Sequence, residues 1–161
     1  VLHHTKDTYL SFEKSIHWLK KDGFVLVGLY NKIGRVRTIF RKYLFKVLGK
    51  NYLMIFDPVL RKIDKNSKPK IDAWIKDQYQ HPVERSHSYD EVLDLFKKTR
   101  IEFINSYPSC ETFQNDGSDK DEMLKKLFIK GKPANYFERI LSQILMIFDR
   151  PGSEGGLFLS K

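Results

Sequence analysis

The feature that most constrains the fold is an uninterrupted apolar run, Phe24–Tyr30, that directly follows a helical pattern and a glycine. Apolar residues recur at helical spacing from Tyr9, Asp7 or Thr8 is placed to cap the first turn, and the helix is expected to end at Asp22-Gly23. A continuous run rich in β-branched and aromatic residues is typical of a strand buried on both faces of a parallel sheet. Helix, glycine and buried strand in this order form half of a βαβ unit, so the sequence predicts an α/β protein.

The rest of the chain continues the alternation of helices and strands. A basic amphipathic stretch, 34–48, predicts a helix with its apolar side chains on one side and its basic side chains mostly on the other. Residues 65–70 are predicted as an exposed loop, and Ser88 and Glu91 have the spacing of a capping box for a helix ending near Lys98. The later elements are predicted as strand, helix, helix and strand over 101–107, 119–129, 135–148 and 156–159.

Positive charge is concentrated in one segment. The formal net charge is +9, and seven Lys and Arg side chains lie between Gly23 and Phe56, where no acidic residue occurs. Such a charge is compatible with a nucleic acid, an anionic membrane or an anionic substrate as partner, or with a lysine-rich proteome. The single cysteine, Cys110, excludes an intramolecular disulfide and a cysteine-rich zinc site. No apolar run approaches the roughly 20 residues that span a bilayer, so no membrane partner is predicted. The single cysteine fits a reducing cytosol, and a cytoplasmic location is therefore expected.

Short motifs follow one another in a fixed order along nearly the whole chain. They are Gly28-Leu29-Tyr30-Asn31, Gly34-Arg35, Asp57-Pro58, Asp77 to Pro82 with Glu84, His87, and Ser153 to Phe158. This ordered set resembles class I, Rossmann-like S-adenosylmethionine-dependent methyltransferases, in the group with a Gly-Leu-Tyr-Asn strand end and an Asp-Gln-Tyr-x-His-Pro segment. The resemblance implies that the helix before Phe24 follows the fourth strand of such a sheet and that Phe24–Tyr30 belongs to the fifth.

The resemblance also implies a domain organisation. Residues 1–161 would be the C-terminal part of a methyltransferase domain, a partial Rossmann-like sheet with helical insertions at about 32–87 and 108–150. The glycine-rich loop and the acidic strand end that hold the cofactor in such folds have no counterpart in this sequence. The N-terminal half of the domain is therefore expected as a missing partner. S-adenosyl-L-methionine is expected as the cofactor of the intact protein, and this chain alone is expected to be inactive.

Candidate active-site residues come from the strand ends that the resemblance defines, because ligands of open α/β sheets bind beyond the carboxyl ends of the strands. His3 and His4 would lie past one such end, and Tyr30 and Asn31 past the next. His3 and His4 are the catalytic candidates, either by contacting the acceptor or by removing its proton; packing at a helix start is the alternative for each. His3 and Tyr30 are the cofactor-binding candidates. No metal site is predicted, because adjacent histidines point in different directions and no carboxylate cluster is near them in sequence.

The substrate-binding candidates are polar and aromatic residues that follow the strand or gather in the first insertion. They are Asn31, Arg35, Asp77, Tyr79, His81, Glu84 and His87. Insertions on a rigid scaffold carry specificity in many enzymes, so this one is interpreted as an acceptor-binding lid. Buried hydrogen bonds that hold an irregular insertion together are the alternative for its members, and a solvated helix face is the alternative for Arg35.

Three classes of function remain open at this point. The favoured one is a methyltransferase fragment whose acceptor the sequence does not name. The second is a basic nucleic-acid-binding module centred on Lys32–Lys50, whose binding would weaken steeply with salt. That segment matches no standard nucleic-acid motif, and its aromatic residues fall on its apolar side. The third is a noncatalytic protein-interaction domain derived from the same fold.

Overall fold

A computed structural model of the chain describes residues 2–109, 120–148 and 155–160 and shows a mixed α/β protein. The chain divides into two compact units. The helical unit is Val36–Glu84, and the sheet unit comprises Val1–Arg35 and Arg85–Lys161. The helical unit falls within the segment 32–87 that the sequence analysis treats as an insertion. Cys110 and the first two residues of the closing motif, 153–154, lie outside the described residues.

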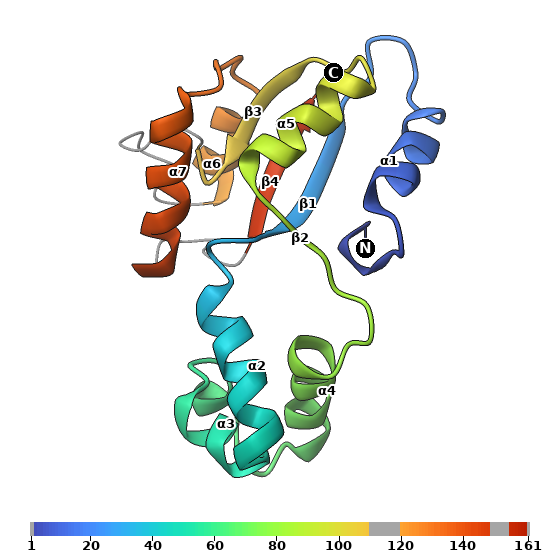
Figure 1. Ribbon diagram of the computed structural model, residues 1–161. Helices are drawn as coiled ribbons and strands as arrows, with labels where there is room; N and C mark the ends of the chain where they lie inside the picture. Colours follow the sequence, from blue (N-terminus) through green and yellow to red (C-terminus); the bar gives the residue numbers. More distant parts are fainter. Residues whose placement is uncertain (1, 110–119, 149–154, 161) are drawn as a thin grey trace. The chain divides into compact units, whose positions relative to one another are not determined.

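The described part of the sheet unit contains four strands in the order β2-β1-β4-β3 (Figure 1). Their bounds are β1 Val25–Asn31, β2 Ser86–His87, β3 Phe103–Tyr107 and β4 Gly155–Ser160. β2 runs parallel to β1, whereas β4 is antiparallel to both β1 and β3, so β1 and β3 are parallel to each other. The three predicted strands are confirmed. β2 was not predicted, because two residues are too few to show an alternating pattern.

The described part of the sheet unit contains six helical elements. They are η1 Leu2–His4, α1 Thr8–Ile16, α5 Tyr89–Lys98, α6 Lys120–Leu127, α7 Tyr136–Leu145 and η3 Met146–Phe148. The Asp7 carboxylate caps α1 by accepting from the Leu10 amide at 2.9 Å. The capping box that opens α5 is confirmed. α1 ends earlier than predicted, and the residues that follow it form turns in which Trp18 is 88% exposed. This exposure leaves Trp18 without the packing that would support a further helical turn.

One face of β1 forms the core of the sheet unit. Val27 and Leu29 are buried against Phe12 of α1 and against α5, which lies across this face (Figure 1). On the other face Leu26 is 51% exposed, and Gly28 is exposed as well. The prediction of a strand buried on both faces is therefore wrong, because an apolar run records side-chain types and not the presence of a second covering layer.

One edge of β1 is only partly paired. β4 pairs with β1 from Val25 to Tyr30, whereas β2 on the opposite edge pairs only with Tyr30 and Asn31. Among the described residues no strand continues this edge toward the start of β1. Within the residues that the structure describes, the sheet unit therefore has an open edge beside its exposed Leu26 face.

The helical unit has its own core. Its elements are α2 Val36–Leu48, α3 Lys50–Phe56, η2 Leu60–Lys62 and α4 Lys68–Tyr79. Five buried side chains pack together, and they are Leu53, Leu60, Ile71, Ile75 and Tyr79. Gly49 separates α2 from α3 with a φ of 74°, a left-handed conformation that glycine adopts without strain. The loop predicted over 65–70 is shorter than expected, because Pro69 is accommodated in the first turn of α4.

The predicted division of α2 into an apolar side and a basic side needs a correction. Thr38 is its buried residue, whereas six of its apolar side chains are exposed to 49–67%. The apolar stripe of this helix is therefore not its packed side. Across the described residues, no helix combines the length and the apolar character needed to cross a membrane.

Candidate functional site

Three aromatic rings and one guanidinium gather at the carboxyl end of β1. The His3 ring centroid lies 4.1 Å from that of Tyr30 and 4.2 Å from that of His4. The Arg35 Cζ lies 3.7 Å from the Tyr30 ring centroid, in cation–π geometry, and this side chain is only 1% exposed. The structure thus brings together four residues that the sequence analysis assigned to catalysis, cofactor and substrate.

The position of η1 explains how the two histidines reach β1. The Arg85 amide donates to the His3 carbonyl at 2.8 Å, and the Thr5 hydroxyl donates to the Leu2 carbonyl at 2.7 Å. η1 is therefore held by the segment that enters β2, the neighbour of β1. These local bonds place His3 and His4 beside Tyr30.

His3 is a neutral imidazole at physiological pH. Burial, the charge of the N-terminal amine and the nearby His4 and Arg35 lower the pKa of His3 from 6.5 to about 4, although a hydrogen bond with the Gly28 backbone opposes the shift. Its Nδ1 is buried and has no hydrogen-bond partner among the described residues. A general base works best when its pKa is near the working pH, so His3 is a weak base at pH 7. The low pKa of His3 therefore argues against proton removal by this residue.

We expect this depressed pKa to make the stability of the sheet unit depend on pH. In the unfolded chain His3 titrates near 6.5, whereas in the folded protein it titrates near 4. The unfolded state therefore binds more protons between these values, and the stabilisation present above pH 6.5 is lost as the pH falls toward 4. Thermal melts of the wild type and His3→Gln between pH 7.5 and pH 5 test this, with a flatter profile expected for the variant. Equal slopes for the two proteins would contradict it.

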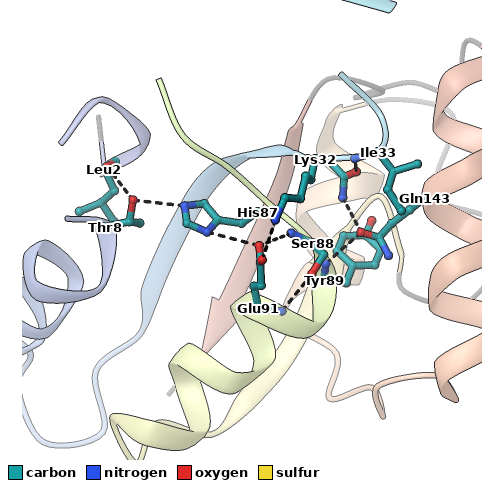
Figure 2. A network of polar contacts seen from close by, with 10 residues as sticks. Leu2, Thr8, Lys32, Ile33, His87, Ser88, Tyr89, Glu91 and Gln143 are labelled. Carbon is teal, nitrogen blue, oxygen red and sulfur yellow. Dashed lines mark hydrogen bonds and ion pairs between the residues drawn. The ribbon is translucent and has the colours of Figure 1, made fainter. Parts of the chain in front are cut away.

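Asn31 has a structural task at this site. Its Oδ1 accepts from the Ile33 and Gly34 amides at 2.9 and 2.8 Å, and its Nδ2 donates to the Gln143 Oε1 at 3.0 Å (Figure 2). The same Gln143 oxygen accepts from the Tyr89 amide at 3.0 Å. Asn31 therefore fixes the turn that leaves β1 and ties it to α5 and α7. This network orients the residues that follow β1, including the predicted substrate residue Arg35.

His87 lies next to the site but directs its ring nitrogens elsewhere. Nε2 is 3.2 Å from the Thr8 Oγ1, and Nδ1 is 3.8 Å from the Glu91 Oε2 (Figure 2). The other oxygen of this carboxylate, Oε1, forms an ion pair with Lys32. Burial lowers the pKa of His87, the Glu91 charge opposes this shift and the Lys32 charge adds to it. His87 thus connects α1, β2 and α5 and supports the site from outside its ring cluster.

In the helical unit, the predicted residue Tyr79 belongs to a buried hydrogen-bond cluster around Asp57. The Asp57 carboxylate accepts from the Val59 and Leu60 amides at 2.7 and 2.9 Å, from the Trp74 indole at 3.2 Å and from the Tyr79 hydroxyl. Burial and the bond to Asp57 raise the pKa of Tyr79. Both side chains are almost fully buried. This geometry favours the alternative interpretation, a set of buried hydrogen bonds that holds the insertion together.

The other predicted residues of the helical unit each interact with a different neighbour. Asp77 is exposed on α4, and its carboxylate accepts from the side-chain amide of Gln78 at 2.7 Å. His81 has its Nδ1 2.6 Å from the Val83 carbonyl oxygen. Glu84 forms a half-buried ion pair with Lys42 at 3.3 Å. The motif residues of this unit are thus distributed over α4 and the loop after it.

Two residues that organise these sites were not among the sequence candidates. Asp57 was noted only as part of a motif, although an aspartate followed by proline before a turn is a typical acceptor for backbone amides. Gln143 left a weaker signal, a buried polar residue within the amphipathic pattern of the helix that became α7. Within 2–109, 120–148 and 155–160, no three His, Cys, Asp or Glu side chains are grouped so that they could hold a metal ion. No protein-family model matches this chain.

Proposed function

We propose that this chain is the C-terminal part of an S-adenosylmethionine-dependent methyltransferase domain and that its ring cluster contributes to the methyl-transfer site. The observation that carries the proposal is the meeting of His3, His4, Tyr30 and Arg35 at the carboxyl end of β1, where ligands of α/β sheets bind. The ordered motifs of the sequence support it. An antiparallel strand between two parallel ones is compatible with the closing part of a Rossmann-like sheet.

The residues of the cluster suit the two reactants of a methyl transfer. When bound, S-adenosylmethionine supplies an electrophilic methyl group on a cationic sulfonium. The neutral His3 imidazole presents no positive charge to such a cation, whereas the Tyr30 ring already carries the Arg35 guanidinium on one face.

The mechanism assigned to the chain's own residues is positioning. Methyl transfer is an in-line displacement, so rate is gained by aligning the nucleophile and by excluding water. Asn31 fixes the turn after β1, and the buried Arg35 is stacked on Tyr30. This arrangement holds the ring cluster in one geometry. His3 and His4 would contact the acceptor, and the low pKa of His3 assigns it contact rather than proton transfer.

The proposal is tested in a protein in which this chain is joined to an N-terminal half with a glycine-rich loop. Calorimetry should detect S-adenosylmethionine binding to the joined protein and no micromolar binding to the isolated chain, because the loop supplies most of the contacts. His3→Ala and His4→Ala should reduce turnover about tenfold or more while changing cofactor affinity less. Trp18→Ala, at an exposed position outside the cluster, is the control.

Two outcomes would count against this function. A joined protein that neither binds the cofactor nor methylates proteins, nucleic acids or small molecules would remove the methyltransferase assignment. Unchanged turnover in both histidine variants would instead return His3 and His4 to a packing role at the start of η1.

A further inference from the structure

Helix α2 carries an exposed apolar row on the helical unit, which we call the α2 stripe. It consists of Val36, Ile39, Phe40, Tyr43 and Val47, exposed to 49–67%. Because an α-helix turns by about 100° per residue, these five positions fall within roughly 100° of its circumference. They form one continuous stripe. Exposed apolar surfaces of this kind mark interaction sites.

The α2 stripe is bordered by basic side chains on both sides. By the same helical geometry, Arg37 lies on one side of the stripe and Lys46 on the other, and both are exposed. Arg41 instead turns toward the packed side, where its guanidinium donates to the Thr38 hydroxyl, and Lys42 pairs with Glu84. α2 contains no acidic residue. Its opposite side is the packed one, with Thr38 buried and Phe45 against the core of the helical unit. The side available to a partner is therefore apolar in the middle and cationic at its borders.

The net charge of the whole helical unit also favours a negatively charged partner. Residues 36–84 contain eleven Lys and Arg against five Asp and Glu, a net charge of +6. Some of these bases are paired, as Lys42 is with Glu84 and Lys50 with Asp72. The net charge of +6 already counts both members of each of these pairs. The partner of this surface must accept apolar side chains and carry negative charge.

We propose that the α2 stripe docks on an anionic phospholipid surface, with its apolar side chains among the acyl-chain ends and its basic borders at the headgroups. Interfacial helices have this combination of an apolar face and Lys or Arg at its edges. Nucleic acid would satisfy the bases but leave Val36, Ile39 and Val47 in water. A second copy of the chain would bring two units of charge +6 together.

This binding differs from the membrane contact that the sequence analysis considered. The expectation of no membrane partner rested on the length of apolar runs, which decides whether a segment spans a bilayer. Peripheral docking needs one exposed face instead. That face is visible only once the structure shows that the basic and apolar side chains share the exposed part of α2 and that Thr38 is on the packed side.

Co-sedimentation of the full chain with vesicles tests the proposal. The probes are vesicles of phosphatidylcholine alone and vesicles with about one third phosphatidylserine. We expect binding to the anionic vesicles that exceeds binding to the neutral ones about tenfold or more at low salt, and that weakens as salt screens the charges. The double variant Phe40→Ser/Val47→Ser should lose about tenfold or more of the binding. Lys46→Glu should lose a similar factor.

Matched variants in the sheet unit separate the stripe from general effects. Trp18→Ser removes an exposed apolar side chain, and Lys14→Glu reverses an exposed charge on α1, and both should bind as the wild type does. Circular dichroism checks that all variants fold. Absent binding, equal binding to neutral vesicles, or binding unaffected by Phe40→Ser/Val47→Ser would each overturn the proposal. A further outcome would assign the surface to nucleic acid instead. In that case a single-stranded oligonucleotide would displace the wild-type protein from the vesicles, and the Phe40→Ser/Val47→Ser variant would still bind the oligonucleotide.

Discussion

Replacing Asp57 with alanine is expected to lower the free energy of unfolding of the helical unit by at least about 3 kcal/mol, because four donors lose their acceptor and each buried unpaired donor costs about 1–3 kcal/mol. The donors are the Val59 and Leu60 amides, the Trp74 indole and the Tyr79 hydroxyl. Asp57→Asn keeps one carbonyl oxygen, so its free energy of unfolding should lie between those of the wild type and Asp57→Ala. The Asp57 cluster is thus expected to decide whether this unit folds.

The measurement uses the two tryptophans of the chain. In a Trp18→Phe background, Trp74 is the remaining tryptophan and its fluorescence reports the helical unit. Urea unfolding then compares Asp57→Ala with Asp72→Ala. Asp72 is exposed and pairs with Lys50 at the surface, so its loss should cost less than about 1 kcal/mol. Equal midpoints for these two variants would show that the four bonds to Asp57 do not hold the unit together.

Joining the chain to an upstream segment that supplies strands beside β1 is expected to raise its melting temperature by about 10 °C or more. At roughly 2–4 °C per kcal/mol for a protein of this size, this corresponds to about 2.5–5 kcal/mol of added stability. The open edge of β1 leaves backbone groups without strand partners, next to the half-exposed Leu26. Such an edge is a recognised route to aggregation. The comparison is between the isolated chain, the joined protein and a fusion to an unrelated domain, all at equal concentration.

A single substitution makes this comparison sharper. In the isolated chain, Leu26→Lys should change the melting temperature little and reduce aggregation, because the side chain is half-exposed and a charge discourages edge pairing. In the joined protein the same variant should destabilise, because a Rossmann-like fold has helices on both faces of its sheet and the upstream half would supply those that cover Leu26. A sharp, reversible transition of the isolated chain, equal to that of the joined protein, would show that the sheet unit needs no further strands.

The parts of the structure that the sequence predicted are those set by neighbouring residues. The Ser88–Glu91 capping box and the Asp7 cap join residues three positions apart, so the pattern and the bond lie in the same short segment. The strand β1 was recognised for the same reason, from seven consecutive side chains. Local patterns fix the type of an element but not what covers it.

The parts that the sequence did not predict depend on residues far apart in the chain. The bond from Asn31 to Gln143 spans 112 positions, and nothing near Asn31 indicates that its amide is used to anchor a turn. The exposure of Leu26 and of the α2 stripe depends on which other elements pack there. For the ring cluster, the resemblance placed His3 and Tyr30 at adjacent strand ends, whereas their centroid distance follows from η1 being bonded to Arg85.

The pairing of β1 with β2 also bears on how such a chain can change over evolution. Tyr30 and Asn31 pair with Ser86 and His87, so the chain leaves the sheet unit after β1 and returns to it on the neighbouring strand. The pairing of β1 with β2 therefore brings together the two points of the sheet unit between which the segment Val36–Glu84 is inserted. Loop-closure entropy grows only logarithmically, by about 0.6 kcal/mol for each doubling of length. Segments of very different length can occupy this place at nearly constant cost to the sheet, which leaves the helical unit free to diversify while the ring cluster keeps its geometry.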